Sequence, residues 1–230
     1  MIKGFRGTSL VDYPGKIASV IYTYGCNFRC PYCYNIELLL PEFYKDLEDL
    51  SEEKIIQHLK ERLSFIQGVV ITGGEPTIWG KRLLSLIDRL KCELALPIKL
   101  DTNGSNPEVI KILLEENLID YIALDLKTSP QRYSELGGDF TQVEKTLDYL
   151  KDHVDKVEIR LTLYPGLIGE EELESLLPYL KPFCRIALQK YLPEKNLSGI
   201  PLTPYPKEVK ERFFLYLQNH IPESHLIKRF

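Results

Sequence analysis

Three closely spaced cysteines are the part of this sequence best suited to chemistry. Cys26, Cys30 and Cys33 follow one another with the spacing C-x3-C-x2-C, and no fourth cysteine or histidine lies nearby. Three thiolates can hold three corners of a [4Fe-4S] cluster and leave the fourth iron open to an outside ligand. The spacing therefore predicts a cluster that takes part in a reaction, rather than one closed by four cysteines for electron transfer.

Other roles for the cysteines fit the sequence less well. The chain has five cysteines in 230 residues, an odd number in a protein far larger than the small domains that disulfides stabilise. A structural zinc ion usually takes four protein ligands, and here the fourth would have to come from a distant part of the chain. A zinc-binding or electron-transfer protein stays open as an alternative to an enzyme. We expect Cys92 and Cys184 to be ordinary buried thiols.

Composition sets outer limits on structure and partners. Hydrophobic residues make up 44% of the chain, and the length suits one domain spanning residues 1–230. The formal net charge of −4 gives no electrostatic footprint for nucleic acid. No segment approaches the roughly 20 apolar residues of a membrane span. Together with the cluster cysteines, these features lead us to expect a cytoplasmic protein with no membrane and no nucleic-acid partner.

Apolar runs alternate with amphipathic segments, and this pattern predicts the elements that position the cysteines. Strands are expected at residues 17–24, 68–72, 98–101, 121–125, 157–163 and 185–189. Helices are expected at about 51–65, 81–92, 141–153, 170–180 and 207–218, and one begins at 107. We expect Thr141 and Glu144 to form a capping box at the start of the helix at 141–153, and Pro178 to interrupt the helix at 170–180. Such alternation favours an α/β fold with a parallel sheet, and six units predict an incomplete (β/α)6 TIM-like barrel. A doubly wound sheet is the alternative.

Polar residues gather where the expected strands end. In parallel α/β folds, ligands bind at the carboxyl ends of the strands. After the cysteine loop, the successive strands supply Gly73-Gly74-Glu75, Asp101-Thr102-Asn103-Gly104, Asp125 with Lys127, Arg160, and Gln189-Lys190-Tyr191. Each feature alone has an ordinary explanation as a turn, a cap or a surface charge. Six strands that direct polar groups to one edge of a sheet indicate a binding site.

These residues also resemble a known family. The cysteine triplet with Tyr32 before its last member, together with the turn Gly73-Gly74-Glu75-Pro76, resembles the radical S-adenosylmethionine (SAM) enzymes. The segments Asp101–Gly104 and Asp125–Lys127 are similar to those of glycyl-radical enzyme activating enzymes. The stretch Gly7–Lys16 resembles the anaerobic ribonucleoside-triphosphate reductase activating protein. The resemblance covers about residues 4–190.

The resemblance implies roles for individual residues. The three cysteines would hold the [4Fe-4S] cluster, and SAM would bind the open iron. Cofactor-binding residues would be Tyr32, Tyr34, Gly73, Gly74, Glu75, Asp101, Asp125, Lys127 and Arg160. Of these, Tyr32 would lie near the adenine, Glu75 near the ammonium group, and Asp125 and Lys127 near the ribose and carboxylate. The resemblance also allows a monovalent cation at Asp101 and Asp125. Tyr34 stands where relatives often have histidine, and the region Gln189–Pro193 lacks the histidine common in pyruvate formate-lyase activating enzymes.

The resemblance implies that this protein is an oxidoreductase that works under anaerobic conditions. Reductive cleavage of SAM would give a 5′-deoxyadenosyl radical, which would remove hydrogen from a glycine of a partner enzyme. Anaerobic ribonucleotide reductase is the expected partner, and flavodoxin or ferredoxin the expected reductant. The cluster and SAM carry the chemistry, so no side chain is nominated as a catalytic acid or base. The alternative is a radical SAM enzyme that acts on a small molecule, a peptide or another glycyl-radical enzyme of the pyruvate formate-lyase type.

Overall fold

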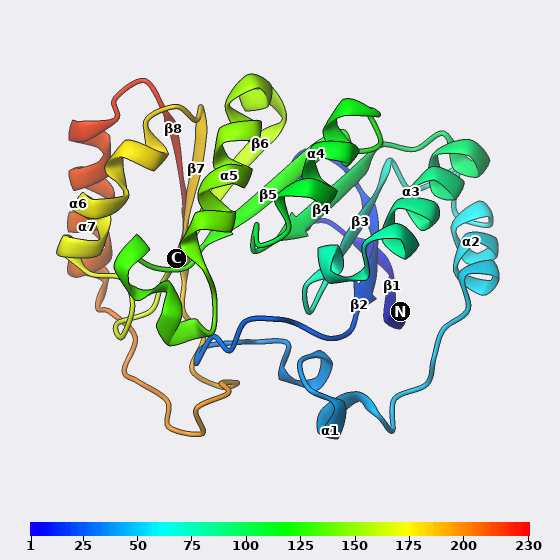
Figure 1. Ribbon diagram of the computed structural model, residues 1–230, viewed down its shortest axis with the longest axis horizontal. Coiled ribbons are helices and arrows are strands. Elements are labelled where there is room, and N and C mark those ends of the chain that lie inside the picture. The colour runs from blue at the N-terminus through cyan, green and yellow to red at the C-terminus, as the bar shows by residue number, and fades with distance from the viewer. The chain divides into compact units, whose positions relative to one another are not determined.

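The computed structural model describes all 230 residues and has an α/β fold (Figure 1). Its eight strands form a sheet in which the order of neighbours is the order of the chain, β1 to β8. Strand β1 is antiparallel to β2, whereas β2, β3 and β4 are parallel, as are β6, β7 and β8. The residues divide into two compact units. The first unit is Met1–Asn27, Glu37–Thr102 and Glu108–Ile122, and the second is Phe28–Ile36, Asn103–Pro107 and Ala123–Phe230.

The first unit contains the first four strands and the helices between them. Its strands are β1 (Ile2–Ser9), β2 (Ala18–Thr23), β3 (Gly68–Gly73) and β4 (Ile98–Thr102). Its helices are α1 (Pro41–Tyr44), α2 (Glu52–Lys60), the 3₁₀ helix η2 (Pro76–Trp79), α3 (Lys81–Leu94) and all but the first residue of α4 (Pro107–Glu115). The buried side chains of α3 recur every three or four residues, from Leu83 to Leu94, as expected for a helix with one apolar face. Helices α2 and α3 lie side by side (Figure 1).

The second unit contains the last strands and helices. They are η3 (Pro130–Leu136), α5 (Phe140–Leu150), η4 (Lys151–Lys156), β6 (Val157–Leu163), α6 (Glu170–Leu180), β7 (Arg185–Lys190), α7 (Lys207–His220) and β8 (His225–Arg229). Strand β5 (Tyr121–Leu126) and the short helix η1 (Ile36–Leu38) each have residues in both units. Helices α6 and α7 lie side by side (Figure 1). No helix combines the length and the apolar character that crossing a bilayer requires.

The predicted α/β class with a parallel sheet is confirmed, and all six predicted strands are present. The sequence pattern missed β1 and β8, because both are only partly buried and lack the continuous apolar run of an interior strand. The predicted capping box of α5 is wrong. Its N-cap is Asp139, whose carboxylate accepts a hydrogen bond from the N–H of Thr141 at 2.9 Å.

Two smaller predictions are also corrected. Helix α6 continues through Pro178 for two residues. The proline removes the one hydrogen bond that its own N–H would make, but the helix continues beyond it to a bond from the Lys181 N–H to the Leu177 carbonyl. Cys92 and Cys184 are exposed rather than buried. Each lies at the periphery of its unit, Cys92 near the end of α3 and Cys184 just before β7.

Candidate functional site

In the first unit, the end of β3 holds the start of the cysteine loop. The N–H of Gly74 donates to the carbonyl of Thr23 at 2.9 Å, and the N–H of Glu75 donates to the carbonyl of Gly25 at 2.8 Å. A Cβ atom on Gly74 would lie 2.0 Å from the carbonyl oxygen of Gly25, so only glycine fits there. Gly73 has a φ of 125°, which also favours glycine. The two predicted glycines therefore position the residue that precedes Cys26.

The carboxylate of Glu75 is fixed by two threonines. Glu75 is 1% exposed, and its Oε1 accepts hydrogen bonds from the Thr77 N–H at 3.0 Å, the Thr77 hydroxyl at 2.6 Å and the Thr102 hydroxyl at 2.7 Å. Thr77 lies in η2, and Thr102 is the last residue of β4. These partners hold Glu75 between the ends of two strands. Sequence reasoning named Thr102 only as part of the segment after the third predicted strand and did not name Thr77. A hydroxyl residue two positions after a buried acid is nevertheless a recognisable capping signal.

Asp101 forms an ion pair with Lys99 on the same strand. Residues two apart on a strand share a face, and the side chains of Lys99 and Asp101 are 2% and 11% exposed. A buried charge requires such compensation. Lys99 was not among the predicted residues, yet a lysine within an otherwise apolar strand, two residues before an acid, is a usable signal for this pairing.

In the second unit, Asp125, Lys127 and Arg160 form one charged group. Arg160 Nε donates to Asp125 Oδ1 at 2.6 Å, and Lys127 Nζ donates to Asp125 Oδ2 at 3.0 Å. The side chains are 26%, 14% and 12% exposed for Asp125, Lys127 and Arg160. Burial would raise the pKa of Asp125, but the charges of Arg160 and Lys127 outweigh it and hold this pKa well below its usual range.

Cys30 and Tyr32 lie within the electrostatic influence of this group. Burial raises the pKa of the Cys30 thiol to about 11, and the charge of Lys127 opposes this rise. Burial would lower the pKa of Lys127, but Asp125 raises it well above its usual value, followed by smaller effects from Tyr32 and Cys30. The hydroxyl of Tyr133 accepts a hydrogen bond from the Lys127 N–H at 3.1 Å, a contact that the sequence pattern did not indicate.

The cysteine loop itself is anchored by its backbone. The N–H of Arg29 donates to the carbonyl of Leu136 at 2.8 Å, and the N–H of Cys33 donates to the carbonyl of Cys30 at 3.0 Å. None of the cysteines forms a disulfide. Cys26 belongs to the first unit, and Cys30 and Cys33 belong to the second.

Tyr34 contacts a residue outside the charged group. It is 52% exposed, and the ammonium group of Lys195 lies 5.3 Å from the centre of its ring. Tyr34 is thus the predicted cofactor-binding residue with the most solvent-accessible side chain. Lys195, which comes from the segment after β7, was not predicted.

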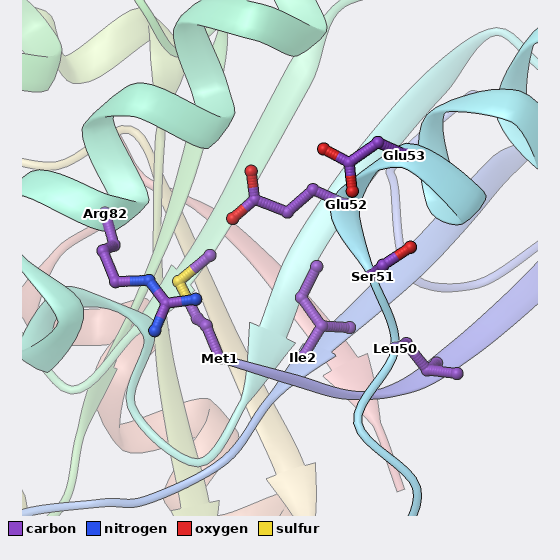
Figure 2. Close-up of a pocket in the computed structure, with 7 residues that line it drawn as sticks. All are labelled: Met1, Ile2, Leu50, Ser51, Glu52, Glu53 and Arg82. Atoms are coloured by element: carbon purple, nitrogen blue, oxygen red, sulfur yellow. The ribbon is translucent and has the colours of Figure 1, made fainter.

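A separate cavity of about 390 Å³ lies in the first unit (Figure 2). Its lining residues are Met1, Ile2, Leu50, Ser51, Glu52, Glu53 and Arg82. In Figure 2, Arg82 extends from α3, while Glu52 and Glu53 stand at the start of α2. None of the predicted site residues lines this cavity.

Comparisons with known proteins identify the family. The family described as the radical SAM superfamily matches residues 20–177. A protein of Methanocaldococcus jannaschii named as a glycyl-radical enzyme activating enzyme is 33% identical over 216 residues, which cover 90% of this chain and 87% of that protein. The pyruvate formate-lyase-activating enzyme of Streptococcus mutans is 29% identical over 217 residues, or 86% of this chain and 80% of that enzyme.

A solved structure shows the same fold. The solved structure of native anSMEcpe with bound AdoMet matches 89% of this chain at a TM-score of 0.66 and 19% sequence identity, and the match spans 62% of that protein. This likeness confirms the predicted fold class. From the family match and the archaeal relative together, the chain belongs to the radical SAM superfamily and, within it, to the glycyl-radical enzyme activating enzymes.

Proposed function

We propose that this protein generates a glycyl radical on anaerobic ribonucleotide reductase. The observation that carries the proposal is the cysteine triplet Cys26, Cys30 and Cys33, in whose loop Cys30 lies under the electrostatic influence of Lys127. The positive charge of Lys127 opposes the effect of burial on the Cys30 thiol, and a cation also attracts the carboxylate of an amino-acid ligand. Family membership implies a [4Fe-4S] cluster and SAM as the cofactors.

The donor set fits the cluster. The cysteine loop offers three thiols, and thiolates are the ligands that iron–sulfur clusters take. Cys30 has a raised pKa, so its thiol is protonated at neutral pH until a metal displaces the proton. We propose Cys26, Cys30 and Cys33 as the three ligands. Lys127, whose charge lowers the pKa of Cys30, would favour the thiolate form that the metal requires.

The remaining predicted residues would hold SAM. Lys127 and Arg160 are proposed as the cations that meet its carboxylate, and Asp125 bonds both through its two oxygens. Glu75, fixed by two threonines, is proposed as the partner of the ammonium group. Tyr32 is proposed to lie against the adenine. The resemblance also offers Asp101 and Asp125 as ligands of a monovalent cation. In this chain both carboxylates form ion pairs, Asp101 with Lys99 and Asp125 with Lys127 and Arg160.

When bound, the cluster and SAM supply an electron and a carbon-centred radical able to take hydrogen from a glycine Cα. The protein's contribution is then to orient SAM and to exclude other hydrogen donors, since positioning alone can lower a barrier by roughly 7–11 kcal/mol. The choice of reductase as partner is supported by the stretch Gly7–Lys16, which resembles that class of activating protein. Flavodoxin or ferredoxin is the proposed reductant.

The test uses the full chain, reconstituted anaerobically with iron and sulfide and reduced with dithionite. With SAM and a reductase that carries α-deuterated glycine, we expect deuterium in the released 5′-deoxyadenosine. With the unlabelled reductase, we expect an electron paramagnetic resonance doublet, which arises from the α-hydrogen that remains on the glycyl radical. Cys30→Ser should abolish both signals, whereas Cys92→Ser, at an exposed thiol, should retain them.

Four outcomes would contradict parts of the proposal. Tight binding of one zinc ion in place of iron, or a failure to cleave SAM, would rule out the proposed radical chemistry altogether. Label transfer from pyruvate formate-lyase but not from the reductase would replace the partner. Cleavage of SAM without label from either glycyl-radical enzyme would favour a small-molecule or peptide substrate.

A further inference from the structure

Lys99 is an unusual residue for the strand that carries it. Strand β4 lies beside β3, with Lys99 opposite Val70, and the neighbouring side chains of Ile98 and Leu100 are fully buried. The side chain of Lys99 is only 2% exposed. A lysine is almost never buried to this extent unless its charge is paired. Here the partner is the carboxylate of Asp101, two residues further along the same face of the strand.

Folding stability alone does not account for this ion pair. Two charges lose their hydration when they are buried, and their mutual attraction offsets little more than that cost. An apolar pair of similar volume is often as stable or more stable at such a position. The chain nevertheless carries a fixed positive charge beside Asp101. This charge therefore points to a role in a site rather than in folding.

Asp101 stands next to a residue that holds part of the proposed SAM site. The hydroxyl of Thr102 donates to Glu75, the proposed partner of the SAM ammonium group, at 2.7 Å. Asp101 and Thr102 are the last two residues of β4. In parallel α/β folds this end of a strand faces the ligand. The charge at Asp101 is therefore part of the electrostatic surroundings of the proposed site.

A monovalent cation at Asp101, which the family resemblance allows, does not fit the residues of this chain. The ammonium group of Lys99 already pairs with that carboxylate, and the two side chains are 2% and 11% exposed. A second cation there would bring an uncompensated and poorly hydrated positive charge into the protein. In the second unit, Lys127 and Arg160 compensate Asp125. A lysine ammonium is a compact group with the same charge as a potassium ion.

We propose that the ammonium group of Lys99 takes the place of a monovalent cation at Asp101, so that this protein binds SAM without potassium or sodium. This inference rests on the proposed function, because it takes SAM as the ligand. Lys99 is then a positioning residue, which acts through Asp101. The chain itself carries the cation, so the cation is present at any salt concentration. Dependence on an alkali ion should therefore appear only when Lys99 is replaced.

The first test compares salts on the wild-type protein, reconstituted anaerobically with iron and sulfide. Potassium chloride, sodium chloride and choline chloride are used at equal ionic strength, so that screening is the same and only the cation differs. Calorimetry measures the affinity for SAM, and illuminated deazaflavin drives the cleavage of SAM without adding an alkali ion. We expect affinity and cleavage rate to be the same in the three salts.

The second test removes the tethered cation. Lys99→Met keeps an unbranched apolar side chain and leaves Asp101 uncompensated. In choline chloride the cluster-free variant should melt below the wild type. The reconstituted variant should bind SAM about tenfold more weakly, because the end of β4 no longer holds Glu75 in place. Replacement of choline by potassium at constant ionic strength should restore most of both losses along a saturable curve.

The matched control is Lys91→Met, which removes the lysine of another ion pair in the first unit. Lys91 bonds Asp120 at 2.6 Å, and that carboxylate also accepts a hydrogen bond from the Ile98 N–H at 2.8 Å. The side chain of Asp120 is 40% exposed, so water can solvate it when its partner is removed. The control should melt at the same temperature in potassium chloride and in choline chloride. A general effect of potassium on the folded protein would appear in the control as well.

The outcomes separate this inference from the proposed function. If the wild type neither binds nor cleaves SAM in any of the three salts, the proposed function fails. If the wild type binds or cleaves SAM better as potassium replaces choline, along a saturable curve, the inference is overturned. It is also overturned if Lys99→Met loses the same stability and affinity in both salts, because Lys99 then serves folding alone.

A second variant covers the case in which Lys99→Met does not fold. Lys99→Met combined with Asp101→Asn removes both charges, so no carboxylate is left to attract a cation. The double variant should therefore melt at the same temperature in potassium chloride and in choline chloride. A melting temperature that rises with potassium in the double variant, but not in Lys91→Met, would place the ion at other residues and overturn the inference.

Discussion

Asp125 shows how a partly buried acid can be kept ionised and used to place two cations. Each of its carboxylate oxygens bonds a different positive group, Arg160 on one side and Lys127 on the other. Removal of one partner from a buried ion pair is costly, because the charge that remains is no longer compensated. Arg160 and Lys127 thus depend on Asp125 for their positions, and Asp125 depends on them for its charge.

The first prediction is a pH-dependent loss of stability in Arg160→Gln. In the wild type the pKa of Asp125 is depressed in the folded state, so its contribution to stability is present above the unfolded pKa, near 3.8, and is lost as the pH falls towards the folded pKa. Without Arg160, burial drives the folded pKa up and this contribution shrinks. Urea denaturation of the cluster-free protein should show the variant less stable by about 2 kcal/mol at pH 7.

The difference in stability between the wild type and Arg160→Gln should narrow below about pH 4, because Asp125 of the unfolded wild type is protonated there. The control is Lys151→Gln, which breaks an exposed pair with Asp148 and should change stability little at any pH. If the difference in stability between the wild type and Arg160→Gln stays constant from pH 7 to pH 3, the lost stability comes from packing and not from the charge of Asp125.

Residue types at the candidate site were predictable, but several of their partners were not. The spacing of the cysteines and the polar ends of the strands pointed to Asp125, Lys127 and Arg160 as separate contributions. That they form one bonded group depends on the pairing of β6 with its neighbours, which no local pattern specifies. The pairing of Asp101 with Lys99 could have been predicted, because alternation along a strand brings residues two apart to the same face.

The turn after β3 shows how two strand ends are fitted together. Its glycines bring the backbone of Gly74 and Glu75 within hydrogen-bonding distance of Thr23, the last residue of β2, and of Gly25, two residues beyond it. The contact is backbone against backbone, so no flexible side chain can move aside to accept a larger residue. The turn thus connects the end of β3 to the start of the cysteine loop.

The second prediction is that Gly74→Ala destabilises the cluster-free protein by about 2–3 kcal/mol, the cost of overpacking. The added methyl group would meet the Gly25 carbonyl and force the start of the cysteine loop to move. Urea denaturation followed by Trp79 fluorescence measures the loss, and iron content after reconstitution should fall as well. The control is Gly169→Ala, because a Cβ there would meet only the flexible end of Glu172 at 3.1 Å. Equal stability losses in the two variants would contradict this account of the turn.

Interior strands and helices with one apolar face could be predicted because their patterns are local. Strand β6 was predicted with its observed ends, since its run from Val157 to Leu163 is largely apolar and β-branched or leucine-rich. Edge elements gave weaker signals, and β1 and β8 were missed for that reason. The N-cap of α5 was misplaced because Thr141 and Asp139 are both good capping residues, and only the geometry decides between them.

The two compact units are interleaved along the chain. The backbone passes from one to the other five times, after Asn27, Ile36, Thr102, Pro107 and Ile122. The short segments Phe28–Ile36 and Asn103–Pro107 belong to the second unit but are joined at both ends to residues of the first. They contribute specific bonds there, such as the one from the Thr146 hydroxyl to the Gly104 carbonyl at 2.7 Å. No composition shift in the sequence marks these passages, so the division could not be predicted.

The third prediction is that both units unfold in one cooperative transition. If the first unit unfolds, the two short segments lose the fixed ends that hold them in the second unit, and contacts such as that of Arg29 with Leu136 are lost with them. Hydrogen exchange measured by mass spectrometry at increasing urea concentrations should give the same opening free energy for peptides from β3 and from β6, within about 0.5 kcal/mol. Trp79 fluorescence supplies the global value, and a peptide covering the short helix α1 serves as the control, exchanging by local opening at every urea concentration. A β6 that opens at a clearly lower free energy than β3, with a separate dependence on urea, would show that interleaving of the chain does not couple the units.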